Sequence, residues 1–421
     1  MANNFDSNFT RKLAKVFLDK FESERVLSKN VNTQLLSGKF GSDTGDTVDF
    51  KRPTDYTSKR TSAGDISGGT RDSIITGKAS GTVQDYFTVD VDFDEADEAL
   101  KMDQLDSLLA PMATRIKTDL ELDFGEFCLK NTALLSGAVG TGVTTWDHVA
   151  GAGAIMQASG VPMDQDWCYF ANPFTQRSLA SNQRSLGGET GSMSANQRAV
   201  ITDNFAGMKV MTATTLPSYT TGVGADRAGT LSGTPTATYL AAKDTMTMSI
   251  AVTAFQANLV VAAGETITVT GRNRLNLSTR KPIVDETGAQ ILFSGTVTAA
   301  VTLNGSGAGT LVITGPGVYE AAGAFNTVDS ALTSGDVVTL GGAASKLIQP
   351  NLFWHKQAFG IGSVPIKKLY STDTIATTED GLQFRVSKYA NGDANKQIVR
   401  FDFRPAYAVL NPFFAGKSFG G

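Results

Sequence analysis

The sequence has few of the residues that most often do chemistry. In 421 residues there are two histidines, His148 and His355, and two cysteines, Cys128 and Cys168. Two cysteines are too few for a disulfide framework in so long a chain, and they form no CxxC pair. His148 begins an alanine-rich segment and His355 follows an aromatic pair, so we interpret both as structural. We therefore predict no catalytic site, no metal site and no cofactor, and the chain is not predicted to be an enzyme.

Charged residues and long apolar runs are also scarce. Charged residues make up 19% of the chain, against about 25% in an average domain. The 37 basic and 41 acidic residues leave a net charge of -4, which argues against a strongly basic nucleic-acid reader. No stretch reaches the roughly 18 uninterrupted apolar residues of a membrane span, and no signal segment is visible at the N-terminus. We expect no membrane partner, and a reducing compartment.

Glycine, threonine, serine and alanine are abundant instead. The 43 glycines exceed the usual share of about 7%, and this composition favours β-structure with many turns over a helical bundle. A chain of this length predicts two or three domains.

The first segment has the pattern of an amphipathic helix. Apolar residues recur every three or four positions from Phe5 to Phe21, which is one face of a helix. Arg11, Lys12 and Lys15 lie on the rest of its surface. They are interpreted either as an ordinary solvated face or as an arm that docks on a partner.

The next segment predicts a β ribbon with a polar excursion. Residues 47–50 and 87–93 alternate at period two, as strands do. Between them, residues 51–71 have few apolar side chains and several basic ones. Because an isolated two-stranded ribbon is marginal in water, we expect this excursion to be disordered or held by a neighbouring molecule.

A long helix and a mixed α/β region follow. Apolar residues from Leu105 to Phe127 recur at three or four, and we predict a continuous helix from about Pro111 to Leu135, with a possible preceding turn from Asp103. Residues 145–216 read as mixed α/β. Its predicted elements are a helix over 148–159, a strand over 167–170 and a helix from Asn172-Pro173 through Leu179.

Residues 220–342 predict a separate β domain. Short strands at 266–270, 290–293, 296–299 and 310–314 are separated by glycine-rich turns, a pattern typical of an antiparallel barrel or sandwich. Gly305–Gly309 is interpreted as a hairpin turn. The segments on either side look mixed again, with strands predicted at 383–386 and 397–403, so an inserted domain is the economical description.

Two motifs resemble ligand sites and are rejected. Asp90-x-Asp92-x-Asp94 begins like a calcium loop, but Glu95 and Lys101 occupy its sixth and twelfth positions, so a strand with a solvated face explains it better. Gly416-Lys417-Ser418 resembles the end of a phosphate-binding loop, but lacks its first glycine.

One local cluster of charge remains. Basic residues gather between 272 and 281, and two acids follow directly. We interpret this as a charged loop suited to complementary contacts between copies, with weak nonspecific contact to a polyanion as the alternative. The residues are Arg272, Arg274, Arg280, Lys281, Asp285 and Glu286.

Four segments, in order, resemble the major capsid proteins of short-tailed double-stranded DNA bacteriophages. The most specific is Asn351-Leu352-Phe353-Trp354-His355-Lys356-Gln357-Ala358-Phe359, because in that family such a run follows an inserted β-barrel. Each motif is short, and their order and spacing across the whole chain carry the resemblance. The other three are Thr47 to Pro53, the long helix after the β ribbon, and Arg400 to Tyr407.

The resemblance implies an α+β fold of the Hong Kong 97 type with an inserted antiparallel β-barrel domain. The domains that it implies are an N-terminal arm (1–36), an extended β loop (37–92), a peripheral domain with a spine helix (93–144), an axial domain in two parts (145–220 and 346–398), the inserted barrel (221–345) and a C-terminal strand and tail (399–421).

The resemblance also implies a function. Copies would form the hexamers and pentamers of an icosahedral shell around double-stranded DNA, from a scaffold-directed procapsid that expands in the bacterial host cytoplasm. The implied partners are the chain itself, a scaffolding protein, a portal protein at one vertex and packaged DNA by nonspecific contact. No lysine crosslink of the loop is predicted, although Lys51, Lys59 or Lys78 lie in it.

Particular residues are candidates for these contacts. In the family, a charged loop of the inserted domain joins capsomers, and here either Asp226 and Arg227 or the stretch from Arg272 to Glu286 matches it. Arg11, Lys12 and Lys15 are candidates for the scaffold contact. The alternative function, suggested by the barrel alone, is a β-rich adhesin or a decoration protein that binds a preformed surface.

Overall fold

The computed structural model describes residues 6–41, 45–69, 71–94, 105–164, 166–186, 201, 204–392 and 396–421. It divides into two compact units, which we describe separately. The first contains Met1–Asp49, Ser80–Gly125 and Phe359–Val409, and the second contains Phe50–Ala79, Glu126–Ala358 and Leu410–Gly421.

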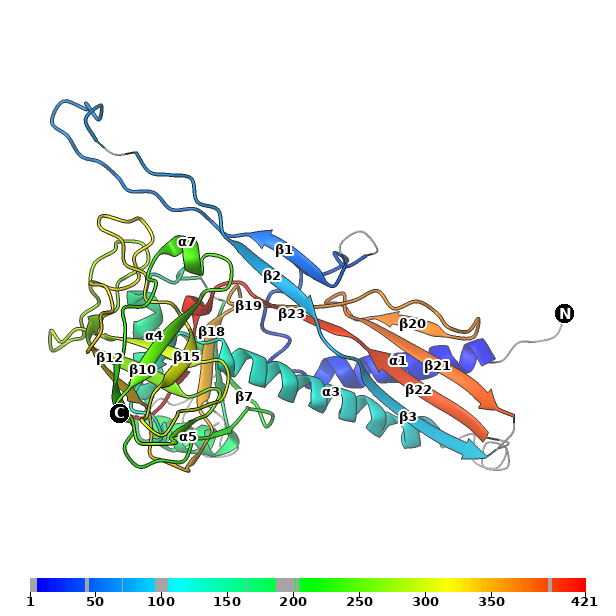
Figure 1. Ribbon diagram of the computed structural model, residues 1–421. Coiled ribbons are helices and arrows are strands. Elements are labelled where there is room, and N and C mark those ends of the chain that lie inside the picture. The colour runs from blue at the N-terminus through cyan, green and yellow to red at the C-terminus, as the bar shows by residue number, and fades with distance from the viewer. Residues whose placement is uncertain are drawn as a thin grey trace. The chain divides into compact units, whose positions relative to one another are not determined.

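The described part of the first unit contains helices α1 and α3 and two sheets (Figure 1). One sheet has the order β20-β21-β22-β3 and is antiparallel, and the other has the order β1-β2-β23-β19. The helices are α1 (Asp6–Glu24) and α3 (Leu105–Lys130), whose last turn passes into the second unit. The strands are β1 (Thr47–Lys51), β2 (Lys78–Val83), β3 (Phe87–Asp94), β19 (Phe359–Ser363), β20 (Thr374–Thr377), β21 (Gln383–Asn391), β22 (Lys396–Phe403) and β23 (Pro405–Val409). The end of β1 and the start of β2 belong to the second unit.

Helix α1 packs its apolar face on the sheet that contains β21 and β22. The ring centroid of Phe17 lies 5.0 Å from that of Phe384 and 4.8 Å from that of Phe401. Phe21 is fully buried and lies 4.5 Å from Phe384. The predicted first helix is therefore confirmed, as are the strands predicted at 47–50, 87–93, 383–386 and 397–403.

The prediction for the long helix was wrong at both ends. The helix begins at Leu105 and runs through Pro111, and it ends at Lys130 instead of Leu135. Its end has a local cause, because the Asn131 amide donates to Phe127 O at 2.8 Å and the Thr132 hydroxyl donates to Leu129 O at 3.2 Å. Side chains that bond the last carbonyls compete with further helix. The predicted preceding turn at Asp103 lies outside the described residues.

The second unit contains a six-stranded mixed sheet of order β4-β24-β18-β5-β7-β6. The β24/β4 and β5/β7 pairs are parallel, and the other three pairs are antiparallel. Every residue of β18, the strand of the most specific motif, is buried. The strands are β4 (Leu134–Ser136), β5 (Trp167–Ala171), β6 (Asn204–Phe205), β7 (Met208–Thr212), β18 (Asn351–His355) and β24 (Ala415–Ser418).

Helices α4 (Trp146–Ala158) and α5 (Pro173–Leu186) accompany this sheet, with a short 3-10 helix, η2 (Pro412–Phe414). Helix α4 contributes Val149 and Met156 to the core that contains Tyr169 of β5. Helix α5 begins as predicted, since Asn172 Oδ1 accepts the Thr175 N–H at 2.7 Å, but it continues seven residues past Leu179. Both cysteines are buried free thiols, and burial raises the pKa of Cys168 to about 11.

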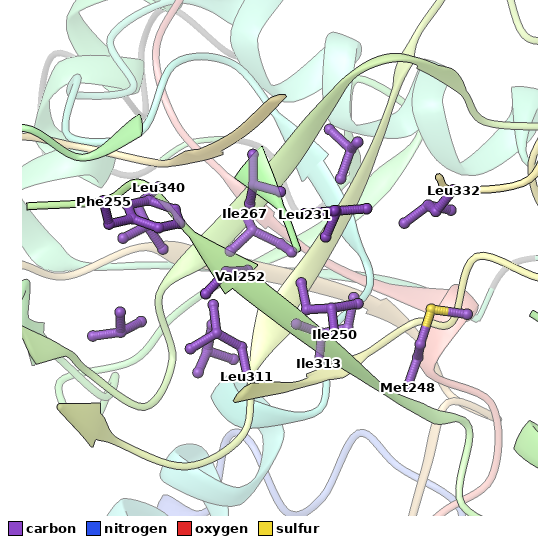
Figure 2. Close-up of a cluster of buried hydrophobic side chains, with 14 of the residues drawn as sticks. Leu231, Met248, Ile250, Val252, Phe255, Ile267, Leu311, Ile313, Leu332 and Leu340 are labelled. Atoms are coloured by element: carbon purple, nitrogen blue, oxygen red, sulfur yellow. The ribbon is translucent and has the colours of Figure 1, made fainter. Parts of the chain in front are cut away.

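The inserted segment folds as a closed barrel of order β10-β15-β13-β12-β16-β9, in which all strand pairs are antiparallel. Met248, Ile250 and Val252 alternate inward along β10, and Figure 2 shows them with Leu311 and Ile313 in the apolar core. This confirms the predicted antiparallel barrel and the α+β class. The strands are β9 (Ala228–Leu231), β10 (Thr247–Thr253), β12 (Thr266–Asn273), β13 (Leu292–Val297), β15 (Gly309–Thr314) and β16 (Val337–Leu340).

Two details of the barrel differ from the prediction. The strands predicted at 290–293 and 296–299 are one strand, β13. The segment Gly305–Gly309 does begin as a turn, because Asn304 Oδ1 accepts the N–H groups of Ser306 and Ala308 at 3.0 and 2.9 Å. It does not join a hairpin, since β15 pairs with β10 and β13. The remaining elements are β8 (Tyr219–Thr220), α7 (Tyr239–Ala242), β11 (Val260–Val261), β14 (Val301–Thr302) and β17 (Leu347–Ile348).

The two rejected motifs are both strands. Residues 90–94 belong to β3, where Asp92 forms an ion pair with Lys396. Residues 416–418 belong to β24, whose side chains are buried. In the described part of the chain, no helix combines the length and apolar character needed to cross a membrane.

Candidate assembly surfaces

The helical arm presents its basic residues away from the core. Leu13, Phe17 and Phe21 are buried, whereas Arg11, Lys12 and Lys15 are exposed. The three cations therefore form a basic face on α1, on its exposed side.

A buried carboxylate holds the turn that follows this helix. Glu121, on α3, accepts the N–H groups of Leu27 at 2.7 Å and of Ser28 at 3.0 Å. It is 1% exposed, so these bonds replace water around the carboxylate. Glu121 was not predicted from the sequence, although it lies one helical turn before Phe124 and hence on the buried face of the helix.

Between β1 and β2, residues 52–77 of the extended loop contain no helix or strand among those that the structure describes. The described side chains from 56 to 74 are mostly exposed. They include apolar ones, with Ile74 76%, Tyr56 53% and Ile66 47% exposed. These three side chains are accessible to a second molecule.

Two of the candidate arginines of the inserted segment are buried. Arg227 is 7% exposed and forms an ion pair with buried Glu265, which also accepts the Gly222 N–H at 2.6 Å. Arg274 is 3% exposed and donates to Ala133 O at 2.8 Å and to Ser294 O at 2.7 Å. Burial lowers the pKa of Arg274 to about 10. Both charges serve contacts within the unit.

Two further candidates have partners within the same unit. Arg272 binds both carboxylate oxygens of Asp336 at 2.7 Å, and this pairing raises the pKa of Arg272. Arg280 donates to Asp55 Oδ2 at 2.5 Å and to Asn326 O at 2.8 Å. Asp55 belongs to the extended loop.

The remaining candidates are the more accessible ones. Lys281, Glu286 and Asp226 are exposed. Asp285 stabilises the turn between β12 and β13, since its Oδ1 accepts the N–H groups of Thr287 and Ala289, and the Thr287 bonds lower the pKa of Asp285. The segment between β12 and β13 thus presents a cation, Lys281, and, in this turn, an anion, Glu286.

The strand that resembled a phosphate loop carries a buried cation. Lys417 is fully buried and its Nζ donates to Gly264 O at 2.5 Å and to Thr296 Oγ1 at 3.2 Å. Burial lowers the pKa of Lys417 to about 7, while the nearby Glu265 acts in the opposite direction. This lysine therefore joins the C-terminal strand to the barrel.

Among the described residues, Asp164, Asp166 and His355 form a group whose side chains are of the types that bind metals. His355 Nε2 lies 2.8 Å from an oxygen of Asp164, and Asp166 is close to both. However, the Gln357 N–H donates to His355 Nδ1 at 3.1 Å, so the proton is on Nε2 and is donated to Asp164. This hydrogen bond uses the nitrogen that would face a metal. His148 has a similar structural role, accepting the Thr144 N–H on Nδ1 at 3.1 Å.

The chain is similar to known proteins in both sequence and structure. Residues 1–421 match the family model described as P22 coat protein, gene protein 5. The chain is 35% identical, over 424 aligned residues covering 100% of both chains, to the major capsid protein of Acyrthosiphon pisum secondary endosymbiont phage 1. A solved structure from Mycobacterium phage Che8 matches with TM-score 0.48 and 12% identity, covering 94% of this chain and 90% of that one. The capsid structure of Cyanophage P-SCSP1u matches with TM-score 0.41 and 10% identity, covering 90% and 84%.

Proposed function

Since this chain belongs to the P22 coat protein family, and is thus a structural protein of a phage capsid and not an enzyme, we propose that its copies associate into the hexamers and pentamers of an icosahedral shell. The match over the whole chain is the observation that carries the proposal. The shell would enclose double-stranded DNA and form as a scaffold-directed procapsid that expands. The alternative of an adhesin or decoration protein does not fit, because the match includes the barrel and the rest of the chain together.

The shell would be held together by many weak contacts. Each contact is modest, but a closed shell repeats every one of them, so the sum is large. The extended loop supports this proposal, since its exposed Ile74 and Tyr56 would be covered by an adjacent copy.

The charged contacts would come from two places. The segment between β12 and β13, with Lys281 and Glu286, is the candidate for contact between capsomers, together with Asp226, because these side chains are exposed. The basic face of α1 is the candidate for contact with a scaffolding protein, since complementary charge speeds and orients association. A portal protein at one vertex and nonspecific contact with DNA complete the proposed partners.

The test is assembly itself. The protein is expressed alone and with a candidate scaffolding protein, and the products are examined by negative-stain microscopy and sedimentation. We expect closed shells or capsomer-sized rings. A monodisperse monomer under both conditions would contradict self-assembly.

Charge reversal tests the roles of the two charged surfaces separately. Arg11, Lys12 and Lys15 changed together to glutamate should abolish scaffold-directed assembly while the subunit stays folded. Lys281→Glu should instead leave capsomers intact but reduce closed shells, and Lys281→Glu with Glu286→Lys should recover part of the loss. Assembly that is indifferent to the α1 reversal would exclude α1 as the scaffold contact.

A further inference from the structure

The base of the extended loop is bound to the inserted domain on both of its sides. On the outgoing side, Arg280 donates to Asp55 Oδ2 at 2.5 Å. On the returning side, the Lys78 N–H donates to Asp244 Oδ1 at 3.1 Å. The two sides are joined to each other, because the Arg52 N–H donates to Gly77 O at 2.8 Å. All of these residues belong to the second unit.

Apolar packing supports the same junction. Ile75 packs on a small buried cluster of Tyr239, Ala242 and Val318. The rings of Tyr239 and Phe325 are stacked, with centroids 3.8 Å apart and planes at 1°. Ile75 thus anchors the loop directly beside Ile74, whose side chain is 76% exposed.

The backbones of the loop and the inserted domain touch at one glycine. A Cβ atom at Gly77 would lie 2.5 Å from Lys243 O and 3.2 Å from Lys243 C. Such a distance to a carbonyl oxygen is far inside van der Waals contact, so any side chain here would force the two backbones apart. The close approach therefore depends on glycine.

Farther from the base, the described hydrogen bonds join residues of the loop to one another. The Thr57 N–H donates to Asp72 Oδ2 at 2.7 Å, and the Thr57 hydroxyl donates to the same carboxylate. The outer part thus holds its own two sides together, while its base is held by the inserted domain.

We propose that the inserted domain aims the extended loop, through a loop clamp made of Tyr239, Lys243, Asp244, Arg280 and Phe325, so that the loop meets a second copy of this chain in a preset direction. This inference rests on the proposed self-assembly. A loop fixed at its base has already lost conformational freedom, so its docking costs less entropy than that of a free loop. The inserted domain would then contribute to assembly by orienting the extended loop of its own subunit, in addition to any contact that its surface makes with a neighbouring copy.

The experiment compares two glycines of the same loop. Gly77→Ala introduces the clash with Lys243 and should release the base of the loop. Gly68→Ala is the matched control, because no heavy atom lies within 4 Å of its Cβ. On unassembled subunits, we expect trypsin to cleave the loop after Lys59, Arg60 and Arg71. Cleavage should be about tenfold faster for Gly77→Ala than for wild type, which corresponds to a loss of about 1.4 kcal/mol in the free energy that holds the loop closed. The control should be cleaved at the wild-type rate. In assembly, Gly77→Ala should give fewer closed shells and more malformed ones.

Asp55→Asn provides a second variant in case Gly77→Ala does not fold. The Asp55 side chain is 45% exposed, so this change should accelerate loop cleavage without lowering the melting temperature. Equal cleavage of wild type and both variants would overturn the clamp. Faster cleavage with unchanged shells would overturn its role in aiming. Faster cleavage in a protein whose wild type forms no shells would support the clamp and contradict the proposed function.

Discussion

Lys417 is a buried cation, and its burial gives the stability of the protein a pH dependence. Burial lowers the pKa of Lys417 to about 7 in the folded state, whereas an unfolded lysine titrates near 10.4. Between these values the unfolded state binds a proton that the folded state does not, so stability rises with pH from about 7 to about 10. Below pH 7 both states are protonated and the cost of burying the charge is fully present.

Replacing Lys417 by methionine should remove this dependence. In chemical denaturation at pH 7 and pH 10, we expect wild type to gain roughly 3 kcal/mol relative to Lys417→Met over this interval. The exposed Lys281→Met is the control and should follow the wild-type profile. Parallel profiles for wild type and Lys417→Met would show that this lysine stays protonated in the folded protein.

Which charges are buried could not be predicted from the sequence. Arg227 pairs with Glu265, 38 positions away, and Lys417 contacts Gly264, 153 positions away. Local sequence shows that a charge is present, but only the folded chain supplies its partner. For this reason the cluster from Arg272 to Glu286 was recognised as charged, while the burial of Arg274 was not foreseen.

At the scale of elements, the docking of α1 can be tested directly. Phe21 is fully buried against Phe384 and Phe403, so Phe21→Ala should destabilise the first unit by about 3–5 kcal/mol. The exposed Lys12→Ala should change stability by less than about 0.5 kcal/mol. Thermal unfolding of both variants gives the comparison, and a cost below about 1 kcal/mol for Phe21→Ala would mean that the arm is loosely packed.

Elements with a clear period were predicted best. The amphipathic α1 and the alternating β3 were found because each carries its apolar side chains on one face, and this leaves a repeat in the sequence. The end of α3 was missed because Leu134 and Leu135 continue an apolar pattern, although their residues form strand β4. An apolar run alone does not distinguish a buried strand from a helix.

For the whole molecule, the inserted barrel was predicted from the change in composition, but which distant strands pair with one another was not. Phe359–Val409 belongs to the first compact unit. Strand β19 pairs with β23, and pairing between distant strands has no local signature. The domain boundaries themselves remain a prediction.

Two compact units predict two unfolding transitions in calorimetry of the unassembled subunit. Phe21→Ala should lower one transition, and Gly77→Ala should lower the other, because these residues belong to different units. The effects should add in the double variant to within about 0.5 kcal/mol. A single transition lowered by both changes would show that the units unfold as one.

Because both thiols are buried, neither is readily accessible to a reagent that labels cysteine. Cysteine reacts as its thiolate, and both Cys128 and Cys168 are buried, the second with a pKa raised to about 11. A cysteine introduced at position 74, where the present isoleucine side chain is 76% exposed, would therefore be the thiol that a maleimide dye reaches first. A dye at that position would report, by its change in emission, the moment at which one copy covers the loop of another.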